Sequence, residues 1–365
     1  MKKILVIIAI IAIISGIGYI AWRYFYPDQT NTQTNENFIN EDDLPAFLRE
    51  NTLKPITNVP IFDYWINKNT GEIYYIETSG KISRITPEDE IQQISPQEVS
   101  GLNYFKPSFD GKYILISLGD LSNKIFSILD IEEDKWKVLG ENTISADWSP
   151  NENLIASAVQ NNSDTEINLI DPRSGKITRV ASFGAYDLEL NWILKDEIYL
   201  SEKPDSKFPG SILALNIKDK TLRFVAREEP GLIVKWFENG TLGIKSANNR
   251  QKNTLSLINR LGQVVANLDF GETLPFKCDI EEALIYCGTH TEEINGITMP
   301  DDYLKRKFYS KDNIISFDIK KNNIEFLFDG ITKNIDIEKL TKQGNNLYLK
   351  NRQDGKLYLL EINEN

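Results

Sequence analysis

Few side chains in this sequence are of the types that carry acid–base or metal chemistry. The chain has one histidine, His290, and two cysteines, too few ligands for an expected zinc site. A Ser-His-Asp site would have to use His290. No phosphate-binding loop, dinucleotide fingerprint or calcium loop is present. Paired carboxylates fall in expected turns or the linker, where they are solvated rather than held in a cleft: Asp42-Asp43, Glu132-Glu133-Asp134, Glu228-Glu229 and Glu281-Glu282. The sequence therefore predicts no catalytic site, cofactor or metal.

The two cysteines lie close together in the sequence. Cys278 ends the expected strand FKC, Cys287 lies within LIYC, and the turn between them falls near residues 281–283. Antiparallel pairing about this turn places the two residues opposite each other, with Cα atoms about 4.5 Å apart. A disulfide is feasible at that separation and persists outside the cytoplasm. We expect a Cys278–Cys287 disulfide; the alternative is a pair of buried thiols that fill the Trp and Ser positions of the repeat described below.

A long insertion follows Cys287. Residues 289–312 add about 20 residues before the strand pattern resumes, and long loops on rigid scaffolds often carry binding residues. The insertion contains His290, Asp301, Asp302 and Tyr303, followed by the basic run 305–307. We take these four residues as a candidate binding loop. The alternative is a solvated loop without a binding role.

Overall charge restricts the possible partners. The chain has 53 acidic and 41 basic residues and a net charge of −12. Binding to nucleic acid needs a basic face, so nucleic acid is not expected as a partner.

The N-terminal segment is apolar. Ile4 to Trp22 contain no charged side chain and would span roughly 28 Å as a helix, close to the hydrocarbon thickness of a bilayer. Lys2 and Lys3 precede the segment and aromatic residues follow it. This predicts a single transmembrane helix within residues 1–26, with a cytoplasmic N-terminus. Residues 27–53 are expected to form a flexible linker. The domain would then be extracytoplasmic at a bacterial cell membrane. A cleaved signal peptide is the alternative, although Gly16-Ile17-Gly18 is a poor cleavage site.

A repeat of about 42 residues organises the rest of the chain. Residues 144–182 form one unit of four strands, in which apolar and polar residues alternate and Gly, Asn, Asp and Pro mark the turns. Corresponding positions recur at spacings of 42, 41, 44, 44 and 42 residues: Trp65, Pro107, Trp148, Trp192, Trp236 and Cys278. Four short strands per repeat of this length are typical of a β-propeller. The predicted fold is therefore an all-β, seven-bladed propeller with an N-terminal transmembrane helix.

The last repeat lacks its fourth strand. Residues 54–59 resemble the fourth strand at 176–180, and they lie outside any complete unit. We expect residues 54–59 to complete the final blade, so that the propeller domain spans 54–365 and no long sheet edge is exposed.

Two of the repeats resemble a known family. Trp148-Ser149-Pro150-Asn151 and Pro107-Ser108-Phe109-Asp110-Gly111 are similar to the motif of TolB-like propellers, also called WD40-like or PD40 repeats. The resemblance covers about residues 54–365. It implies the fold and says little of function, because propellers host many activities.

The expected function is a non-catalytic binding or scaffold module, tethered to the membrane, that meets a protein partner in the cell envelope. One alternative is a glycan-acting hydrolase or lyase with its site in the central channel. Another is a propeller that binds cell-wall carbohydrate through exposed aromatic rings. An enzyme would bring carboxylates and aromatic side chains together at one channel mouth, beside a pocket.

Overall fold

The computed structural model describes residues 52–362, apart from 121–122, 186, 238–239, 250–251 and 291–295. The predicted membrane anchor at 1–26, and the predicted linker up to residue 51, lie outside this range. Within the described residues, no helix has the length and apolar character needed to cross a bilayer.

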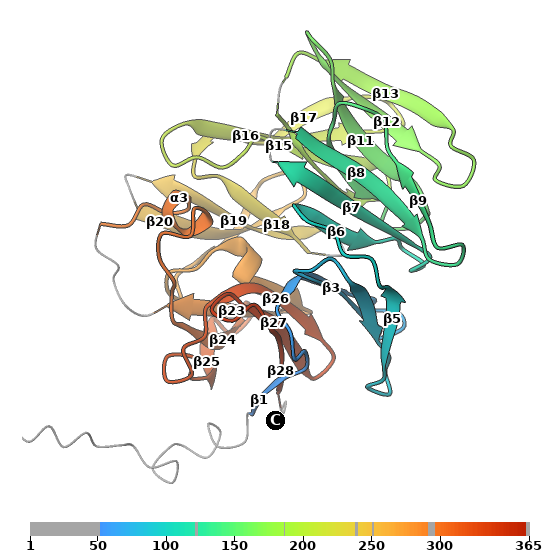
Figure 1. The fold of residues 1–365 in the computed structure, drawn as a ribbon. Coiled ribbons are helices and arrows are strands. Elements are labelled where there is room, and N and C mark those ends of the chain that lie inside the picture. Colours follow the sequence, from blue (N-terminus) through green and yellow to red (C-terminus); the bar gives the residue numbers. More distant parts are fainter. Residues whose placement is uncertain are drawn as a thin grey trace, which may run out of the picture. The chain divides into compact units, whose positions relative to one another are not determined.

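Seven antiparallel sheets of four strands each follow one another around a ring (Figure 1). The predicted all-β, seven-bladed propeller is thereby confirmed. Blade 1 contains β2 Ile61–Ile66, β3 Ile73–Glu77, β4 Ile82–Ile85 and β5 Ile91–Ser95, and blade 2 contains β6 Tyr104–Pro107, β7 Tyr113–Asp120, β8 Asn123–Asp130 and β9 Lys135–Val138. Blade 3 contains β10 Thr143–Trp148, β11 Ile155–Gln160, β12 Thr165–Ile170 and β13 Ile177–Phe183, and blade 4 contains β14 Glu189–Leu194, β15 Glu197–Ser201, β16 Pro209–Asn216 and β17 Leu222–Pro230. Blade 5 contains β18 Ile233–Trp236, β19 Leu242–Asn249, β20 Lys252–Asn259 and β21 Val264–Leu268, and blade 6 contains β22 Cys278–Glu281, β23 Leu284–His290, β24 Asp312–Asp318 and β25 Asn323–Phe328. Blade 7 contains β26 Ile337–Gln343, β27 Asn346–Asn351, β28 Leu357–Glu361 and β1 Leu53–Pro55.

An Asp or Asn follows the apolar residues of the third strand, and its side chain binds the backbone of the turn to the fourth strand. In blade 3, Asp171 Oδ1 accepts hydrogen bonds from the backbone N–H groups of Arg173 (2.9 Å) and Ser174 (3.2 Å). In blade 6, Asp318 Oδ1 accepts from Lys320 and Lys321 in the same way, at 2.8 and 3.0 Å. These side chains satisfy turn N–H groups that have no ladder partner, which explains why the pattern recurs along the sequence.

The ring closes in blade 7, where the start of the domain pairs with its end. Strand β1 lies antiparallel to β28, with Leu53 opposite Leu360 and Pro55 opposite Tyr358. The ladder stops at Pro55, although the N–H of Ile56 still donates to Leu357 O at 2.9 Å. The strand thus begins one residue before the segment 54–59 that was predicted to complete the final blade, and it covers only the first two residues of that segment.

The innermost strand of each blade lines the axis of the ring, and apolar side chains fill the space between neighbouring blades. Trp148 and Trp192 are each 1% exposed, and the Tyr199 and Trp236 rings, from blades 4 and 5, lie 4.4 Å apart. Successive strands in a blade run in opposite directions. The first connection of each blade, between its first and second strands, therefore lies on one face of the ring, and the second connection lies on the other.

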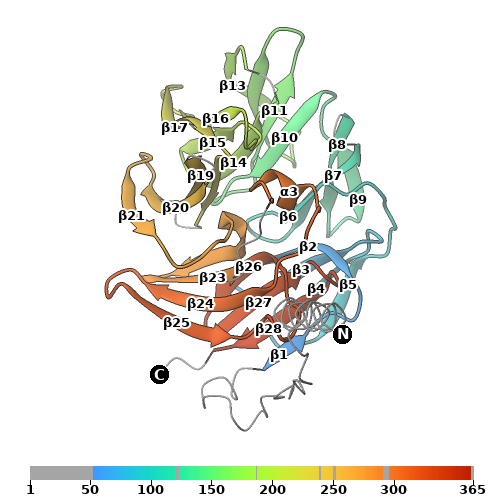
Figure 2. The ribbon, with the colours of Figure 1, turned by 90° about the vertical axis from the view of Figure 1, so that its left-hand side faces the viewer.

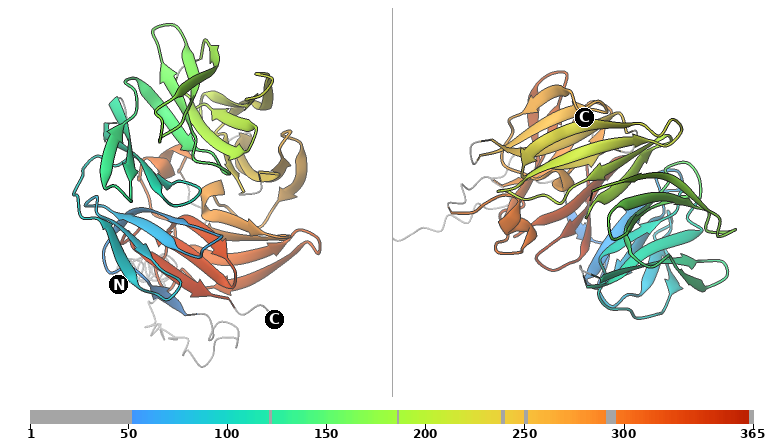
Figure 3. Two further views of the ribbon diagram at one scale, coloured as in Figure 1. Left: turned by 90° about the vertical axis from the view of Figure 1, so that its right-hand side faces the viewer. Right: turned by 90° about the horizontal axis from the view of Figure 1, so that it is seen from above.

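The predicted insertion lies in the second connection of blade 6. It spans residues 291–311 rather than 289–312, because β23 continues through His290 and β24 begins at Asp312. The insertion carries the short helix α3, Asp301–Leu304, and a 3₁₀ turn at Pro275–Lys277 precedes β22. Figure 2 shows α3 near the middle of the ring, on the face that we call the insertion face. The left view of Figure 3 shows the opposite side of the ring.

The structure corrects two of the repeat correspondences. In blade 3, Trp148 pairs with Ile155 near the start of the second strand. The residue at the equivalent position is Ile66 in blade 1, which pairs with Ile73, and Ile280 in blade 6, which pairs with Ile285. Trp65 is therefore displaced by one residue, and Cys278 by two, from the position of Trp148. Hairpin length differs between blades, so equal spacing along the sequence does not ensure equal register.

Candidate binding pocket in the central channel

A cavity of about 490 Å³ occupies the channel and extends to the first connections of blades 1 to 3, on the face opposite the insertion. We call this opening the channel mouth. Every blade contributes a side chain to the cavity from its innermost strand: Trp65, Lys106, Asp147, Asn191, Lys235, Asp279 and Thr341. Asp63 and Lys339 form part of the same wall. Carboxylates and aromatic side chains thus converge beside a pocket, as expected for the enzyme alternative.

The carboxylate of Asp147 accepts hydrogen bonds from three neighbouring blades. One carboxylate oxygen accepts from Lys106 Nζ at 2.6 Å, from the Tyr104 hydroxyl at 2.7 Å and from its neighbour's N–H, that of Trp148, at 2.8 Å. The other oxygen accepts from the N–H of Trp192 at 2.8 Å. Burial, reinforced by the charge of Asp147, raises the pKa of Tyr104 well above its usual value, so this phenol stays protonated. The Asp147 side chain is 3% exposed and joins blades 2, 3 and 4.

The other two channel carboxylates are used in the same way. Asp63, in blade 1, accepts from Lys339 of blade 7 at 2.8 Å. Asp279, in blade 6, accepts the backbone N–H of Lys342 in blade 7 at 2.8 Å. Each aspartate also accepts the N–H of the next residue in its own strand. The three carboxylates therefore bridge blades.

The aromatic side chains divide into a buried and an accessible set. Trp148, Trp192 and Trp236 are buried between blades. Trp65 is half-buried, and Phe109 at the mouth is 43% exposed. The turn that carries Phe109 is tightly held, because Ser108 Oγ donates to Asp110 Oδ1 at 2.9 Å and Asn153 donates to Asp110 Oδ2 at 2.7 Å. The motif Ser108-Phe109-Asp110-Gly111 thus builds a rigid turn and leaves the phenylalanine ring free of the core.

Gly111 is required in this turn. Its φ is +70°, and a Cβ at this position would lie 2.7 Å from the Tyr74 hydroxyl. Any other residue would meet both backbone strain and a side-chain clash.

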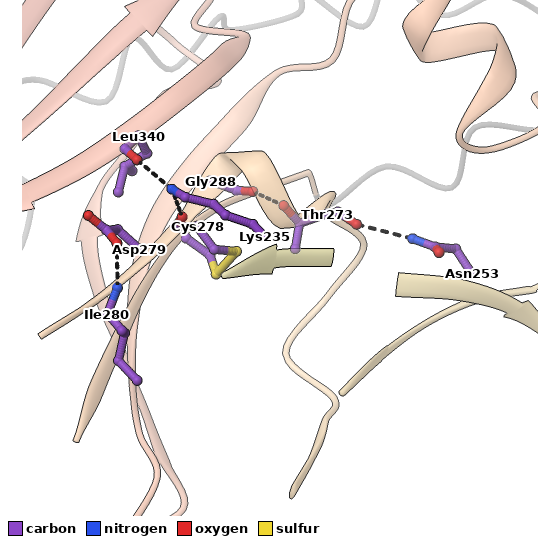
Figure 4. Close-up of a disulfide and its surroundings, with 9 residues drawn as sticks. Lys235, Asn253, Thr273, Cys278, Asp279, Ile280, Gly288 and Leu340 are labelled. Atoms are coloured by element: carbon purple, nitrogen blue, oxygen red, sulfur yellow. Dashed lines mark hydrogen bonds between the residues drawn. A yellow bond between two sulfur atoms is a disulfide. The ribbon is translucent and has the colours of Figure 1, made fainter. Parts of the chain in front are cut away.

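The predicted disulfide between Cys278 and Cys287 is present (Figure 4). The two residues face each other across β22 and β23, with Cα atoms 4.1 Å apart, and both are fully buried. The backbone carbonyl of Cys278 accepts a hydrogen bond of 2.5 Å from Lys235 Nζ, which also donates to Leu340 O at 3.0 Å. The disulfide therefore joins two strands of blade 6, one of which also binds a lysine of the channel wall.

Replacing both cysteines with alanine should lower the free energy of unfolding by about 2–3 kcal/mol, the amount expected for a bond that closes a short loop. Urea unfolding of the wild-type and variant chains, with and without reductant, measures the effect. Reductant should shift the wild-type midpoint and leave that of the variant unchanged. Alkylation of unreduced, denatured wild-type protein at either cysteine would contradict the disulfide.

The four residues of the predicted binding loop make internal contacts and do not converge on the pocket. His290 belongs to β23 rather than to the loop; it is buried, and its Nε2 lies 3.1 Å from Glu272 Oε2. Asp301 accepts from the backbone N–H and the hydroxyl of Ser206, in blade 4, at 3.0 and 2.9 Å. Asp302 accepts from Lys307 Nζ at 2.5 Å and from Thr298 N at 2.8 Å. Tyr303 is 3% exposed.

A buried charge cluster beneath the insertion gave no signal in the sequence. Lys277 Nζ donates to Asp312 at 2.6 Å and to Asp336 at 3.1 Å, and all three side chains are at most 2% exposed. Arg352, also 2% exposed, lies 3.5 Å from Asp336 and balances the second carboxylate. The Tyr303 hydroxyl donates to Asp336 at 2.9 Å, and burial together with these carboxylates raises its pKa far above the usual value. The cluster fixes the insertion to blades 6 and 7.

The part of the chain that the structure describes was also compared with the ligand sets that hold metal ions. No group of three or more His, Cys, Asp or Glu side chains there is arranged to hold a metal ion.

Solved structures share the fold at low sequence identity. No protein-family model and no curated protein matches the chain. Oligogalacturonate lyase from Vibrio parahaemolyticus is similar over 86% of this chain and 94% of its own, at 9% identity and a TM-score of 0.59. The WD40 repeats of RRP9 are similar over 85% and 97%, at 10% identity and a TM-score of 0.57. The fold is that of a β-propeller. Identities this low establish nothing further.

TolB from Acinetobacter baumannii is also among the similar structures. The match has 17% identity and a TM-score of 0.42, and it covers 56% of this chain and 53% of TolB. This similarity is too weak to support the narrower TolB-like assignment or a shared function.

Proposed function

We propose that this protein is a non-catalytic, TolB-like binding propeller of the cell envelope, held at the membrane by its N-terminal segment, and that it engages a protein partner through the channel mouth. This proposal rests on the hydrogen bonds that the three channel carboxylates accept between blades. Asp63, Asp147 and Asp279 each bridge two or more blades, and Asp147 and Asp279, which accept on both oxygens, would have to release structural hydrogen bonds to act on a substrate. A pocket with accessible aromatic side chains, Trp65 and Phe109, suits the binding of a ligand.

An extracytoplasmic location is supported by the disulfide, since such bonds persist in oxidising compartments. It is also consistent with the apolar segment at residues 4–22.

The second candidate is a glycan-acting enzyme. The fold shared with oligogalacturonate lyase and the aromatic side chains in the channel favour it. The hydrogen bonds that Asp147 and Asp279 accept on both carboxylate oxygens argue against it.

Site-specific photocrosslinking tests the proposal in the full-length chain. Benzoylphenylalanine is placed at Asn69, an exposed residue of the mouth, and at Ile177, a control that is 61% exposed on the outer strand β13. Irradiation of intact cells should give an adduct with a defined envelope protein from position 69 and not from position 177. Absence of a protein adduct at position 69 would contradict the proposal. Shortening of oligogalacturonate or peptidoglycan fragments by the purified chain would support the enzyme instead.

A further inference from the structure

Four lysines and three aspartates line the channel pocket, and these side chains differ in how far they are exposed. Lys106 is 31% exposed above Asp147, which is 3% exposed. Asp279 is 6% exposed. Lys339 and Asp63, which form an ion pair, are exposed to a similar extent, at 33% and 27%. A ligand entering the pocket therefore meets more positive than negative charge, although the chain as a whole carries −12.

Lys106 has hydrogen-bonding capacity to spare. An ammonium group has three N–H donors. Among the described residues, the one acceptor within hydrogen-bond distance of Lys106 Nζ is Asp147 Oδ1, at 2.6 Å. Asp147 meanwhile receives three further hydrogen bonds, two of them from backbone N–H groups, so its negative charge is well stabilised without exclusive use of the lysine. An incoming carboxylate could thus bind Lys106 without breaking the contact between blades.

Lys106 shares the pocket with accessible aromatic side chains. Trp65 and Phe109 line the same pocket, the first half-buried and the second 43% exposed. Phe109 follows Lys106 by three residues and is held by the rigid Ser108–Asp110 turn. The pocket therefore pairs a cation with accessible aromatic rings.

The insertion limits how a ligand can enter. At the end of the ring away from the mouth, α3 lies near the middle of the insertion face (Figure 2), where Tyr303 contacts the Phe276 ring at 5.6 Å and donates to Ile337 O at 3.1 Å. The Ser206–Asp301 contact fastens the helix to blade 4 as well as to its own blade. A chain threaded along the axis would have to displace these contacts, whereas a tip inserted through the mouth would not.

We propose that the channel pocket receives a protruding tip of the partner protein that carries an acidic side chain or a C-terminal carboxylate beside an apolar residue. Lys106 binds the carboxylate, and Trp65 and Phe109 pack against the apolar group. This inference rests on the proposed function, and it names the chemistry by which the partner is recognised. A glycan fits less well, because two of the three channel carboxylates that would bind sugar hydroxyls, Asp147 and Asp279, already accept hydrogen bonds on both oxygens.

The test adds three substitutions to the chain with benzoylphenylalanine at position 69. Lys106→Gln keeps a donor for Asp147 and removes the charge, Lys106→Arg keeps the charge, and Phe109→Ala removes the exposed ring. Adduct yield should fall about tenfold in Lys106→Gln, since a hydrogen bond between charged groups is lost, and should be largely retained in Lys106→Arg. Phe109→Ala should also lower the adduct yield. Because Phe109 is exposed, this variant should fold normally, and it tests the inference even if urea unfolding shows that Lys106→Gln is poorly folded.

Mass spectrometry of the adduct provides the second readout. The crosslinked peptide should contain an Asp, a Glu or the partner's C-terminus within a few residues of the attachment point, and the matching synthetic peptide should lose binding when that carboxylate is amidated. An adduct whose yield is unchanged in both Lys106→Gln and Phe109→Ala would overturn the inference and leave the proposed function standing. The complete absence of a protein adduct would instead refute the proposed function. An adduct on glycan alone would support carbohydrate binding.

Discussion

Replacing Lys277 with methionine should lower the free energy of unfolding by about 3–5 kcal/mol, the range found when one partner of a buried ion pair is removed. The substitution leaves Asp312 and Asp336 with one cation, Arg352, at 0–2% exposure. It also removes the donor to the Ser310 hydroxyl, at 2.7 Å. Urea unfolding followed by circular dichroism measures the change.

Two variants separate lost charge from lost packing. Lys305→Met changes a lysine that is 63% exposed and should have little effect, because exposed ion pairs contribute little. The double variant Lys277→Met/Asp312→Leu removes a cation and an anion together and should recover part of the loss. A Lys277→Met protein as stable as wild type would mean that the cluster is not buried as described.

Replacing Asp147 with alanine should lower the free energy of unfolding by about 2–4 kcal/mol. The N–H groups of Trp148 and Trp192 lose their acceptor, and each unsatisfied buried donor costs about 1–3 kcal/mol. Because Asp147 connects three blades, the variant should also give a broader urea transition if the ring unfolds less cooperatively.

Asp171→Ala is the matched control in the same blade. Its carboxylate also accepts two backbone N–H groups, but in a solvent-accessible turn where water replaces the lost acceptor. The expected cost is below about 1 kcal/mol. Equal losses in the two variants would contradict the special role of Asp147 between blades.

Local patterns were sufficient to predict the blades. Alternation of apolar and polar residues with period two defines a strand wherever one face is buried, and Asp171 or Asp318 ends its strand by binding the turn that follows. The disulfide was predictable for the same reason, since Cys278 and Cys287 belong to one hairpin and a short turn fixes their pairing.

Contacts between blades were not predictable in this way. Trp192 N and Asp147 are 45 residues apart, and Asp63 and Lys339 are 276 residues apart. Which inner-strand residue faces its neighbour depends on register, and register shifted at Trp65 and Cys278 because hairpin lengths vary. The four residues His290, Asp301, Asp302 and Tyr303 looked free for binding. Asp302 binds within the insertion, whereas the partners of the other three lie on distant segments: Glu272, Ser206 and Asp336.

The sequence by itself determined the repeat, the strand order within blades 1 to 6 and the cysteine pairing, because all three depend on neighbours within one repeat. The tertiary structure alone decided that Lys277 is buried, that the channel aspartates bind between blades and that Lys106 remains accessible. Closing the ring brings distant inner strands around one axis, and burial and charge pairing there depend on every blade at once.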